Sequence, residues 1–364
     1  MDSKKYNNTK LTLSILNGVL TFVLLLLFVT SGYSGKLVNY ISTYTSNNYI
    51  ILLIYTIVIS VLFSVIFFPL NFYSEFILEH KYNLSNQTFV QWIWENTKEM
   101  LVGGAIGIPL LLAFYYVLVA FGNLWWLPFA ILLFLVSVVL AKIVPVFILP
   151  LFYKVTPIEN EDLKERILKL SENVNMKVEN IFQFDMSKNT KKANAAFTGL
   201  GKTKKILLGD TLTNEFTNDE IETVIAHELG HYKHKHIIKN LIIGTLTSFV
   251  TLYLLALLYS HSLSWFGFKS ITEIAALPIL ALWGMLLGII QTPLTNILSR
   301  KYEYQADEYA VKVTNKGEVF INTLEKLNKQ NLGDEEPHPF VEWFFHSHPS
   351  VKRRVAFIKS ISKS

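Results

Sequence analysis

Long uncharged, apolar runs alternate with polar segments along this chain of 364 residues. Six runs have this character, and they cover residues 11–30, 49–70, 101–121, 124–141, 240–260 and 274–298. A helix needs about 20 apolar residues to cross the hydrocarbon core of a bilayer. The pattern therefore predicts six transmembrane helices, of which the third and fourth form a tight hairpin at Gly122 and Asn123. We expect Pro145 and Pro150 to break the chain after the fourth helix.

The polar stretch between the fourth and fifth runs has the composition of a soluble lobe. Short apolar segments bounded by Gly, Asn and Lys predict a small sheet, with a hairpin turn near Gly201. Its strands are expected at residues 181–184, 195–199 and 205–209. The predicted fold class is a mainly α membrane protein with an α+β lobe. Four regions follow from this: four spans in residues 1–150, the lobe in 151–236, two further spans in 237–298, and a catalytic helix and tail in 299–364.

Lys and Arg are unevenly distributed between the two sides of the predicted bundle. They are concentrated in the N-terminal residues, the connection 71–100, the stretch 142–239 and the tail, whereas the other loops carry only Lys36 and Lys269. Loops rich in Lys and Arg stay in the cytoplasm. We therefore expect both termini and the lobe to be cytoplasmic.

Composition excludes several classes of protein. With 51% hydrophobic residues, the chain is too apolar for an ordinary soluble domain of this length. The net charge of +5 comes largely from Lys at the ends of apolar runs, which indicates a lipid bilayer and not nucleic acid as the partner. Because there is no Cys, a bound metal must be held by His and carboxylate side chains.

A His-Glu-x-x-His motif at residues 227–231 carries the candidate chemistry. Thr217 and Glu220 form a predicted capping box that starts a helix before it. On a helix, His227 and His231 lie one above the other and can present two imidazoles to one Zn²⁺, with Glu228 beside the open position.

The third ligand distinguishes between families of zinc peptidase. A metzincin needs Gly and His where this chain has His234 and Ile237. The sequence therefore excludes the metzincin class. A gluzincin takes a Glu from a later helix, and Glu303 follows after two spans that return the chain to the same side. Asp307, one turn further along, can hydrogen-bond a ligating imidazole. We expect Glu308 to be solvated.

Two other histidines and two other classes of protein are alternatives to this interpretation. His234 is about 10 Å from His227 along the helix, so we expect it at the surface, and His236 receives no role. An intramembrane site-2 protease would bury its motif inside a span and use a Leu-Asp-Gly motif, which is absent here. A zinc transporter or sensor would place its ligands near the middle of the membrane, whereas the spans are almost free of charge.

Taken together, the chain resembles the M48 family of membrane metallopeptidases, Ste24 type, also called the CAAX prenyl protease 1 family. This chain departs from the eukaryotic members, which have seven spans and a long insert before the helix of the His-Glu-x-x-His motif. It lacks the first of those spans and the insert. The stretches that carry the resemblance are FPLNFYSEFILEHKYNLSNQT (68–88), KANAAFTGLGKTKKILLGDTL (192–212), VIAHELGHYKHKH (224–236), SRKYEYQADEYA (299–310), LNKQNLG (327–333) and HSHPSVKRRV (346–355).

The resemblance implies further site residues. It assigns substrate backbone to an edge strand formed by Asn194, Ala195, Ala196 and Phe197, which fits the addition of an extended peptide as a strand. His348 would stabilise the oxyanion as a second catalytic residue beside Glu228. Arg354 would support the substrate cleft.

The expected function is that of a zinc metalloendopeptidase with one Zn²⁺ per chain, which cleaves the C-terminal tails of prenylated or other membrane-associated proteins. A quality-control protease for damaged membrane proteins is the alternative. No oligomer is required. The missing insert and the Lys-, Asn- and Ile-rich composition favour the cytoplasmic membrane of a prokaryote; in a eukaryote, the resemblance implies the endoplasmic reticulum membrane.

Overall fold

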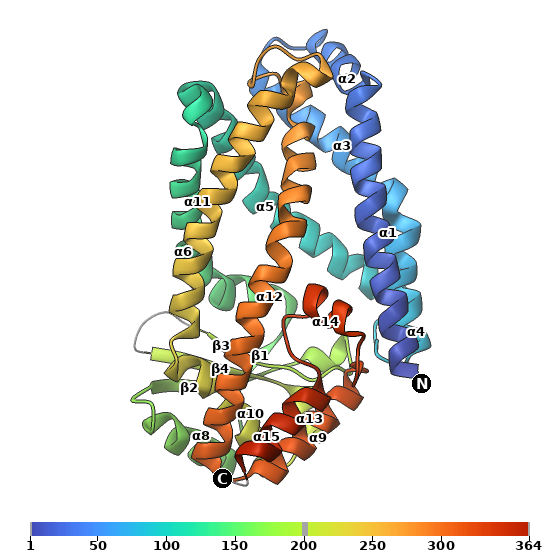
Figure 1. Ribbon diagram of the computed structural model, residues 1–364. Coiled ribbons are helices and arrows are strands. Elements are labelled where there is room, and N and C mark those ends of the chain that lie inside the picture. The colour runs from blue at the N-terminus through green and yellow to red at the C-terminus, as the bar shows by residue number, and fades with distance from the viewer. Residues whose placement is uncertain (1, 199–202, 363–364) are drawn as a thin grey trace.

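Among residues 2–198 and 203–362, which this computed structural model describes, six helices are long and apolar enough to cross a membrane. This confirms the prediction of six spans. The candidate spans are Asp2–Thr30, Asn48–Lys81, Phe89–Leu124, Trp126–Phe152, His236–Phe266 and Ile274–Thr314. They form an elongated bundle, and the lobe lies at one end of it (Figure 1).

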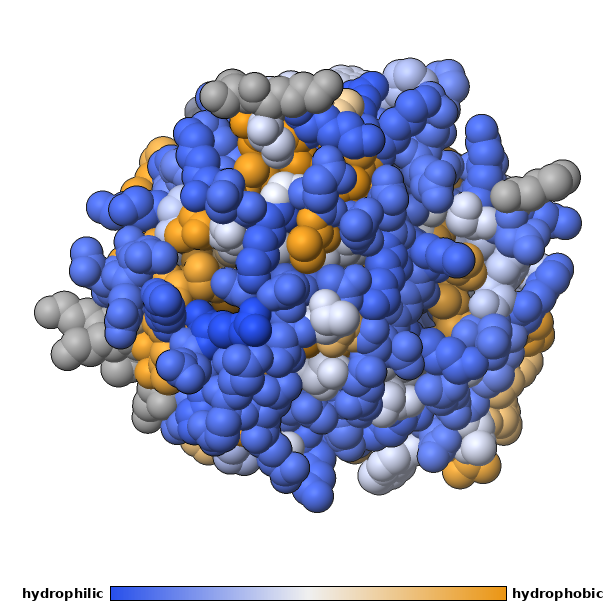
Figure 2. All heavy atoms as spheres, turned by 90° about the horizontal axis from the view of Figure 1, so that it is seen from below, coloured by the Kyte–Doolittle hydropathy of each residue, from blue (hydrophilic) through white to orange (hydrophobic). Residues whose placement is uncertain are grey.

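The membrane bundle is built from long helices and the short helical segments that adjoin them. They are α1 (Asp2–Thr30), α2 (Tyr33–Ser42), α3 (Asn48–Asn71), α4 (Leu78–Lys81), α5 (Phe89–Phe121), α6 (Trp126–Ile143), α7 (Leu149–Phe152), α11 (His236–Ser262) and α12 (Pro278–Thr314). Large apolar side chains remain exposed along them, among them Val65 at 68% and Leu246 at 63%. The end of the molecule that carries the lobe is covered mainly by hydrophilic residues (Figure 2). This distribution suits a bundle surrounded by lipid.

The chain stays helical where a break was predicted after α6. A π-helical turn, Val144–Ile148, continues α6 into α7, so the expectation that Pro145 and Pro150 end the helical path is wrong. Pro145 lies within the π-helical turn and Pro150 lies in the segment that follows it directly, and such a local π adjustment accommodates residues that lack an N–H. A second π-helical turn, Phe72–Ile77, joins α3 to α4.

The lobe contains a four-stranded sheet with the order β1-β2-β4-β3. The strands are β1 (Val155–Pro157), β2 (Lys177–Phe184), β3 (Ala195–Thr198) and β4 (Thr203–Gly209). β2 and β4 are parallel, and the outer pairs are antiparallel. The three predicted strands are confirmed, whereas β1 was not predicted. The predicted turn near Gly201 lies outside the described residues.

Six further helices complete the lobe around the sheet. They are α8 (Glu161–Glu172), α9 (Asp210–Glu215), α10 (Asn218–Lys233), α13 (Gly317–Gln330), α14 (Pro339–Phe345) and α15 (Val351–Ile361). The predicted capping box of α10 is confirmed: the Glu220 amide donates to Thr217 Oγ1 at 3.3 Å, and Glu220 Oε2 accepts from the Thr217 amide at 2.8 Å.

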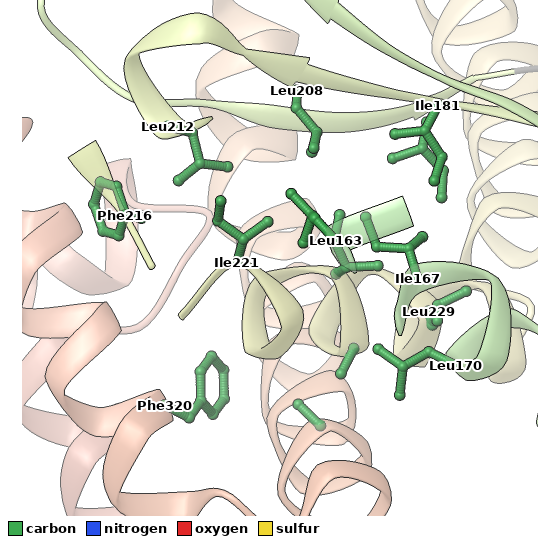
Figure 3. Packing of buried hydrophobic residues seen from close by; sticks show 14 of the residues in the cluster. Leu163, Ile167, Leu170, Ile181, Leu208, Leu212, Phe216, Ile221, Leu229 and Phe320 are labelled. Atoms are coloured by element: carbon green, nitrogen blue, oxygen red, sulfur yellow. The ribbon is translucent and has the colours of Figure 1, made fainter. Parts of the chain in front are cut away.

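α10 lies at the centre of the lobe, between the sheet and the surrounding helices. Its residues Ile221 and Leu229 point into a core shared with β4, α8 and α13 (Figure 3). Leu163 and Ile167 of α8 and Leu208 of β4 are at most 1% exposed. This packing fixes the depth and rotation of α10, because interior side chains occupy defined rotamers at high density.

A buried carboxylate connects the start of the chain to the lobe. Glu79 of α4 accepts a hydrogen bond from the Tyr6 hydroxyl at 2.6 Å and forms ion pairs with Lys10 at 2.8 Å and Lys192 at 3.0 Å. Lys192 stands three residues before β3. The N-terminal end of α1 therefore lies at the same end of the molecule as the lobe (Figure 1).

Gly230 sets the distance between α10 and α12. A Cβ atom at this position would lie 2.8 Å from the Cα of Ala306 and 3.0 Å from its carbonyl oxygen. Both are backbone atoms, which cannot move without displacing a helix. The two helices therefore approach at a contact that only Gly allows.

We predict that Gly230→Ala destabilises the protein by about 1–3 kcal/mol, because the added methyl overpacks a contact between two backbones. Thermal unfolding of the detergent-purified chain measures this. Gly288→Ala is the matched control, since a Cβ there has no atom within 4 Å. An equal unfolding midpoint for the two variants would contradict the proposed close contact.

Candidate metal centre

His227 and His231 stand one helical turn apart on α10 and face the same side. Their Nε2 atoms are 3.2 Å apart. The backbone hydrogen bonds of a helix fix this spacing, and the packing of α10 fixes its direction. Two imidazole nitrogens therefore converge, as the motif predicts.

Glu303 brings a carboxylate to these two nitrogens from α12. Its Oε2 lies 3.4 Å from His227 Nε2, and its Oε1 lies 3.3 Å from His231 Nε2. The residue is 4% exposed, and within the described residues Oε2 has no hydrogen-bond partner. A buried carboxylate oxygen without a partner is costly unless another group binds it. The three side chains form a group that fits a metal ion.

Asp307 and Arg354 stand directly behind His227. The Asp307 Oδ1 atom lies 2.8 Å from His227 Nδ1, and the carboxylate is fully buried. The Nε of Arg354 donates to Asp307 Oδ2 at 2.9 Å, and its Nη2 donates to Oδ1. A carboxylate in this place selects the imidazole tautomer whose Nε2 lone pair is free for a metal.

The carboxylates also control the charge of the site. Burial opposes a charge on His227, but the adjacent carboxylates of Asp307 and Glu303 outweigh it and raise the pKa of His227 to about 9. Burial likewise opposes the charge on Arg354, whereas the Asp307 carboxylate raises the pKa of that guanidinium. The site is therefore an environment that favours positive charge.

A cavity of about 260 Å³ is lined by two of the three candidate ligands, His227 and Glu303. Glu228, His348 and Arg354 line it, together with Asn194 and Ala195 beside the sheet. The Nε2 atom of His348 lies 3.4 Å from Glu303 Oε1, and its side chain is 63% exposed. The structure thus brings predicted residues from four separate segments of the chain to one cavity, whereas His231 and Asp307 are not part of its lining.

The loop that carries His348 is held from two sides. Arg300 of α12, one turn before Glu303, donates to the carbonyl oxygens of Glu342 and His346 at 2.9 and 2.5 Å. The buried carboxylate of Glu342 accepts from the Ser350 amide at 3.2 Å. These contacts satisfy the end of α14 and the start of α15, and they fix the chain between the two helices.

Asn331 holds the chain immediately before β3. Its Oδ1 accepts from the Ala193 amide at 2.9 Å, and its Nδ2 donates to the Ala193 carbonyl at 3.3 Å. Asn194 follows directly, and its carbonyl accepts from the Gly209 amide at 2.9 Å. The segment LNKQNLG was part of the family resemblance, but Asn331 received no role from the sequence alone. The motif alone does not show that the Asn331 side chain contacts the chain before β3.

His234 and Glu308 take no part in the candidate metal group. His234 ends α10 and lies outside the candidate metal group. Glu308 lies on the exposed face of α12, where Lys312 pairs with it. Arg354 lines the cavity, but its donors are directed at Asp307. His236 is 2% exposed and lies 2.9 Å from His231, a contact that sequence reasoning missed.

Two family models together match nearly the whole chain. Residues 157–362 match the model described as peptidase family M48. Residues 1–154 match a model described as the CAAX prenyl protease N-terminal region with five membrane helices. Within residues 2–154 the structure contains four candidate spans.

The chain is also similar to individual proteins along most of its length. It is 29% identical to a protein named uncharacterized metalloprotease YhfN from Bacillus subtilis, over 97% of this chain and 84% of that protein. It is 34% identical to CAAX prenyl protease 1 of Saccharomyces cerevisiae, over 81% and 69% of the two chains. The crystal structure of S. mikatae Ste24p superposes with a TM-score of 0.88 at 30% identity, and the match covers 98% of this chain and 88% of that one.

We predict that Glu303→Gln weakens metal binding by at least about 100-fold, because the amide removes both the charge and the anionic ligand. Metal content after dialysis against a weak chelator, measured by mass spectrometry, checks this. Glu308→Gln changes a solvent-facing carboxylate of the same helix and should keep the metal. A Glu303→Gln protein with its full metal content would rule out Glu303 as a ligand.

Proposed function

Because this chain belongs to peptidase family M48 and to its Ste24 type, we propose that it is a zinc-dependent endopeptidase of the membrane, with one Zn²⁺ held by His227, His231 and Glu303. The observation that carries this proposal is the convergence of two imidazole nitrogens and one carboxylate: the two Nε2 atoms are 3.2 Å apart, and Glu303 places Oε2 3.4 Å from His227 Nε2 and Oε1 3.3 Å from His231 Nε2. Tetrahedral zinc with bonds of about 2.0–2.1 Å requires ligand atoms about 3.3–3.4 Å apart. The unpartnered Oε2 of Glu303 supports the same assignment.

Each residue around the cavity then has a chemical task. Zinc held by these residues would lower the pKa of its bound water towards 7 and polarise the scissile carbonyl. Glu228 lines the cavity beside the ligands, where its carboxylate accepts the proton of the attacking water and delivers it to the leaving amine. His348 donates a hydrogen bond to the oxyanion. Asp307 keeps His227 in the tautomer that binds the metal, and Arg354 balances the charge of Asp307.

β3 is the proposed binding edge for the peptide backbone. It pairs with β4 on one side, and no described strand pairs with its other side. Residues 194–198 lead from the cavity along this edge. An extended peptide that adds to the sheet here would pass the three ligands with its backbone held by main-chain hydrogen bonds.

The proposed substrates are the C-terminal tails of prenylated or other membrane-associated proteins. Relatives that carry the name CAAX prenyl protease 1 suggest the prenylated class. The Bacillus subtilis relative, which covers more of the chain, carries a name without a substrate. A quality-control protease for damaged membrane proteins is the alternative function. We further propose that the lobe and both termini are cytoplasmic, as the distribution of Lys and Arg indicates.

The alternative of a zinc transporter or sensor has less support. A transporter holds its ion near the middle of the membrane, in polar gaps of its spans. The candidate ligands of this chain lie on α10, a helix of the lobe, and on the lobe end of α12 (Figure 1). A hydrolytic site at the end of the bundle agrees better with this location.

Glu228→Gln should retain zinc but lower peptide hydrolysis by about 10²–10⁴-fold, because the amide cannot accept the proton of water. Cleavage of a quenched peptide by the purified protein, with the zinc content of the same sample, tests this. Glu215→Gln, an exposed position on α9, should cleave normally. Near-normal turnover in Glu228→Gln would refute the assignment of the base.

The substrate class is tested with a farnesylated peptide and its unlipidated twin, whose cleavage products are identified by mass. We expect the farnesylated peptide to have the higher kcat/KM, since burial of a long apolar chain adds binding energy. Equal cleavage of both peptides would instead favour the quality-control role.

A further inference from the structure

His236 is a buried histidine beside the metal centre that has no part in the proposed chemistry. We propose that His236, supported by Gln305, positions His231 by accepting the hydrogen bond from its Nδ1, so that Nε2 is presented to the metal. This inference rests on the proposed zinc site and adds a positioning residue to it.

The contacts form a chain that leads away from the metal. The Nε2 atom of His231 faces His227 and Glu303, so its Nδ1 lies on the opposite side of the ring. That Nδ1 is 2.9 Å from Nδ1 of His236. The Nε2 of His236 is in turn 2.9 Å from Oε1 of Gln305.

The direction of the hydrogen bonds follows from the ligand role of His231. A metal occupies the Nε2 lone pair, so the hydrogen of a neutral His231 is on Nδ1 and must be donated. His236 accepts it on Nδ1 and therefore carries its own hydrogen on Nε2. Gln305 Oε1 accepts that hydrogen. Each group in the series thus has the tautomer or orientation that the next one requires.

The ring of His236 is held in place by its neighbours. It stacks on Tyr302 with ring centroids 4.0 Å apart and an angle of 12° between the planes. The ring of His234 lies 5.5 Å away, also nearly parallel. Tyr302 and Gln305 flank Glu303 on α12. The same helix that supplies the third ligand therefore also supports the partner of the second.

The left-handed backbone conformation of Lys235 makes the contact between His231 and His236 possible. On an uninterrupted helix, residue 236 would be rotated by about 140° from His231 and would point away from it. Lys235 has φ 57° and ψ 35°, a conformation that ends α10 and starts α11. The resulting turn of the chain directs His236 back towards His231.

The rings of the two histidine ligands are therefore oriented by different hydrogen-bond partners. Behind His227 stands a carboxylate with its guanidinium partner, whereas His231 donates to a neutral imidazole that leads to an amide. A neutral acceptor orients the ring without adding negative charge to the site. Orientation, and not basicity, is therefore the expected contribution of His236.

The test compares the zinc affinity of the full chain in detergent with that of three variants, by competition with a chromophoric chelator. His236→Phe keeps the ring and its stacking but removes the acceptor, and we expect its zinc affinity to fall by about 10–100-fold. His234→Phe makes the same substitution two residues away, keeps the ring contacts and should leave the affinity unchanged.

The variant His236→Asn tests whether a different hydrogen-bond acceptor at this position restores zinc affinity. Its amide oxygen occupies the place of Nδ1 and can accept from His231, although the ring is lost. We expect it to bind zinc more tightly than His236→Phe. Thermal unfolding of each metal-free variant shows whether it is folded, and only folded samples are compared.

Two results would overturn the inference. One is a folded His236→Phe protein with the zinc affinity of the unsubstituted chain. The other is an equal loss in His236→Phe and His236→Asn, which would show that the acceptor is not what matters. Failure of the zinc site itself looks different, because the unsubstituted chain would then neither bind zinc nor cleave peptide.

Discussion

The close contact between α10 and α12 is the constraint on which the rest of this structure depends. Gly230 lets the backbone of α12 approach at Ala306, and this approach brings Glu303 to the two histidines of α10. The ligands themselves add little cohesion without a cation, because three polar groups are crowded in a buried place. Apolar packing of the lobe therefore has to hold the helices together, and the cluster around Ile221 and Leu229 supplies it.

A second consequence of this contact is that one helix organises several parts of the site. α12 carries Arg300, Glu303, Gln305 and Asp307 within eight residues. Successive turns of this helix hold the loop of His348, provide a ligand, support His236 and orient His227. A shift of α12 would change all four interactions together. The two spans that precede the C-terminal half of α12 thus belong to the construction of the active site as much as to the membrane anchor.

The lobe and the membrane bundle also meet beside β3, the strand that we propose as the binding edge for substrate. Glu79 of α4 and Tyr6 of α1 contact Lys192, and Asn331 holds Ala193, so the residues before β3 are fixed by both parts of the molecule. An edge strand is otherwise a mobile element, because half of its backbone groups are unpaired. Ordering it in advance reduces the entropy that an extended peptide loses on binding.

The sequence alone determined the features that depend on local periodicity. Apolar runs of about 20 residues identified the six spans, and the i, i+4 spacing of His227 and His231 predicted two converging imidazoles. The capping box of Thr217 was equally local. Glu303 could be inferred because the chemistry of the site needs a carboxylate and the spans return the chain to the same side.

Tertiary structure decided what depends on distant contacts or on single dihedral angles. The role of His236 follows from the left-handed conformation of Lys235, and that of Asn331 from its position beside Ala193. The prolines after α6 failed as predicted breaks because a π-helical turn accommodates them. Spacing along a sequence records which residues share a helix face. It does not record where a helix ends, or that the chain then turns and directs His236 back towards His231.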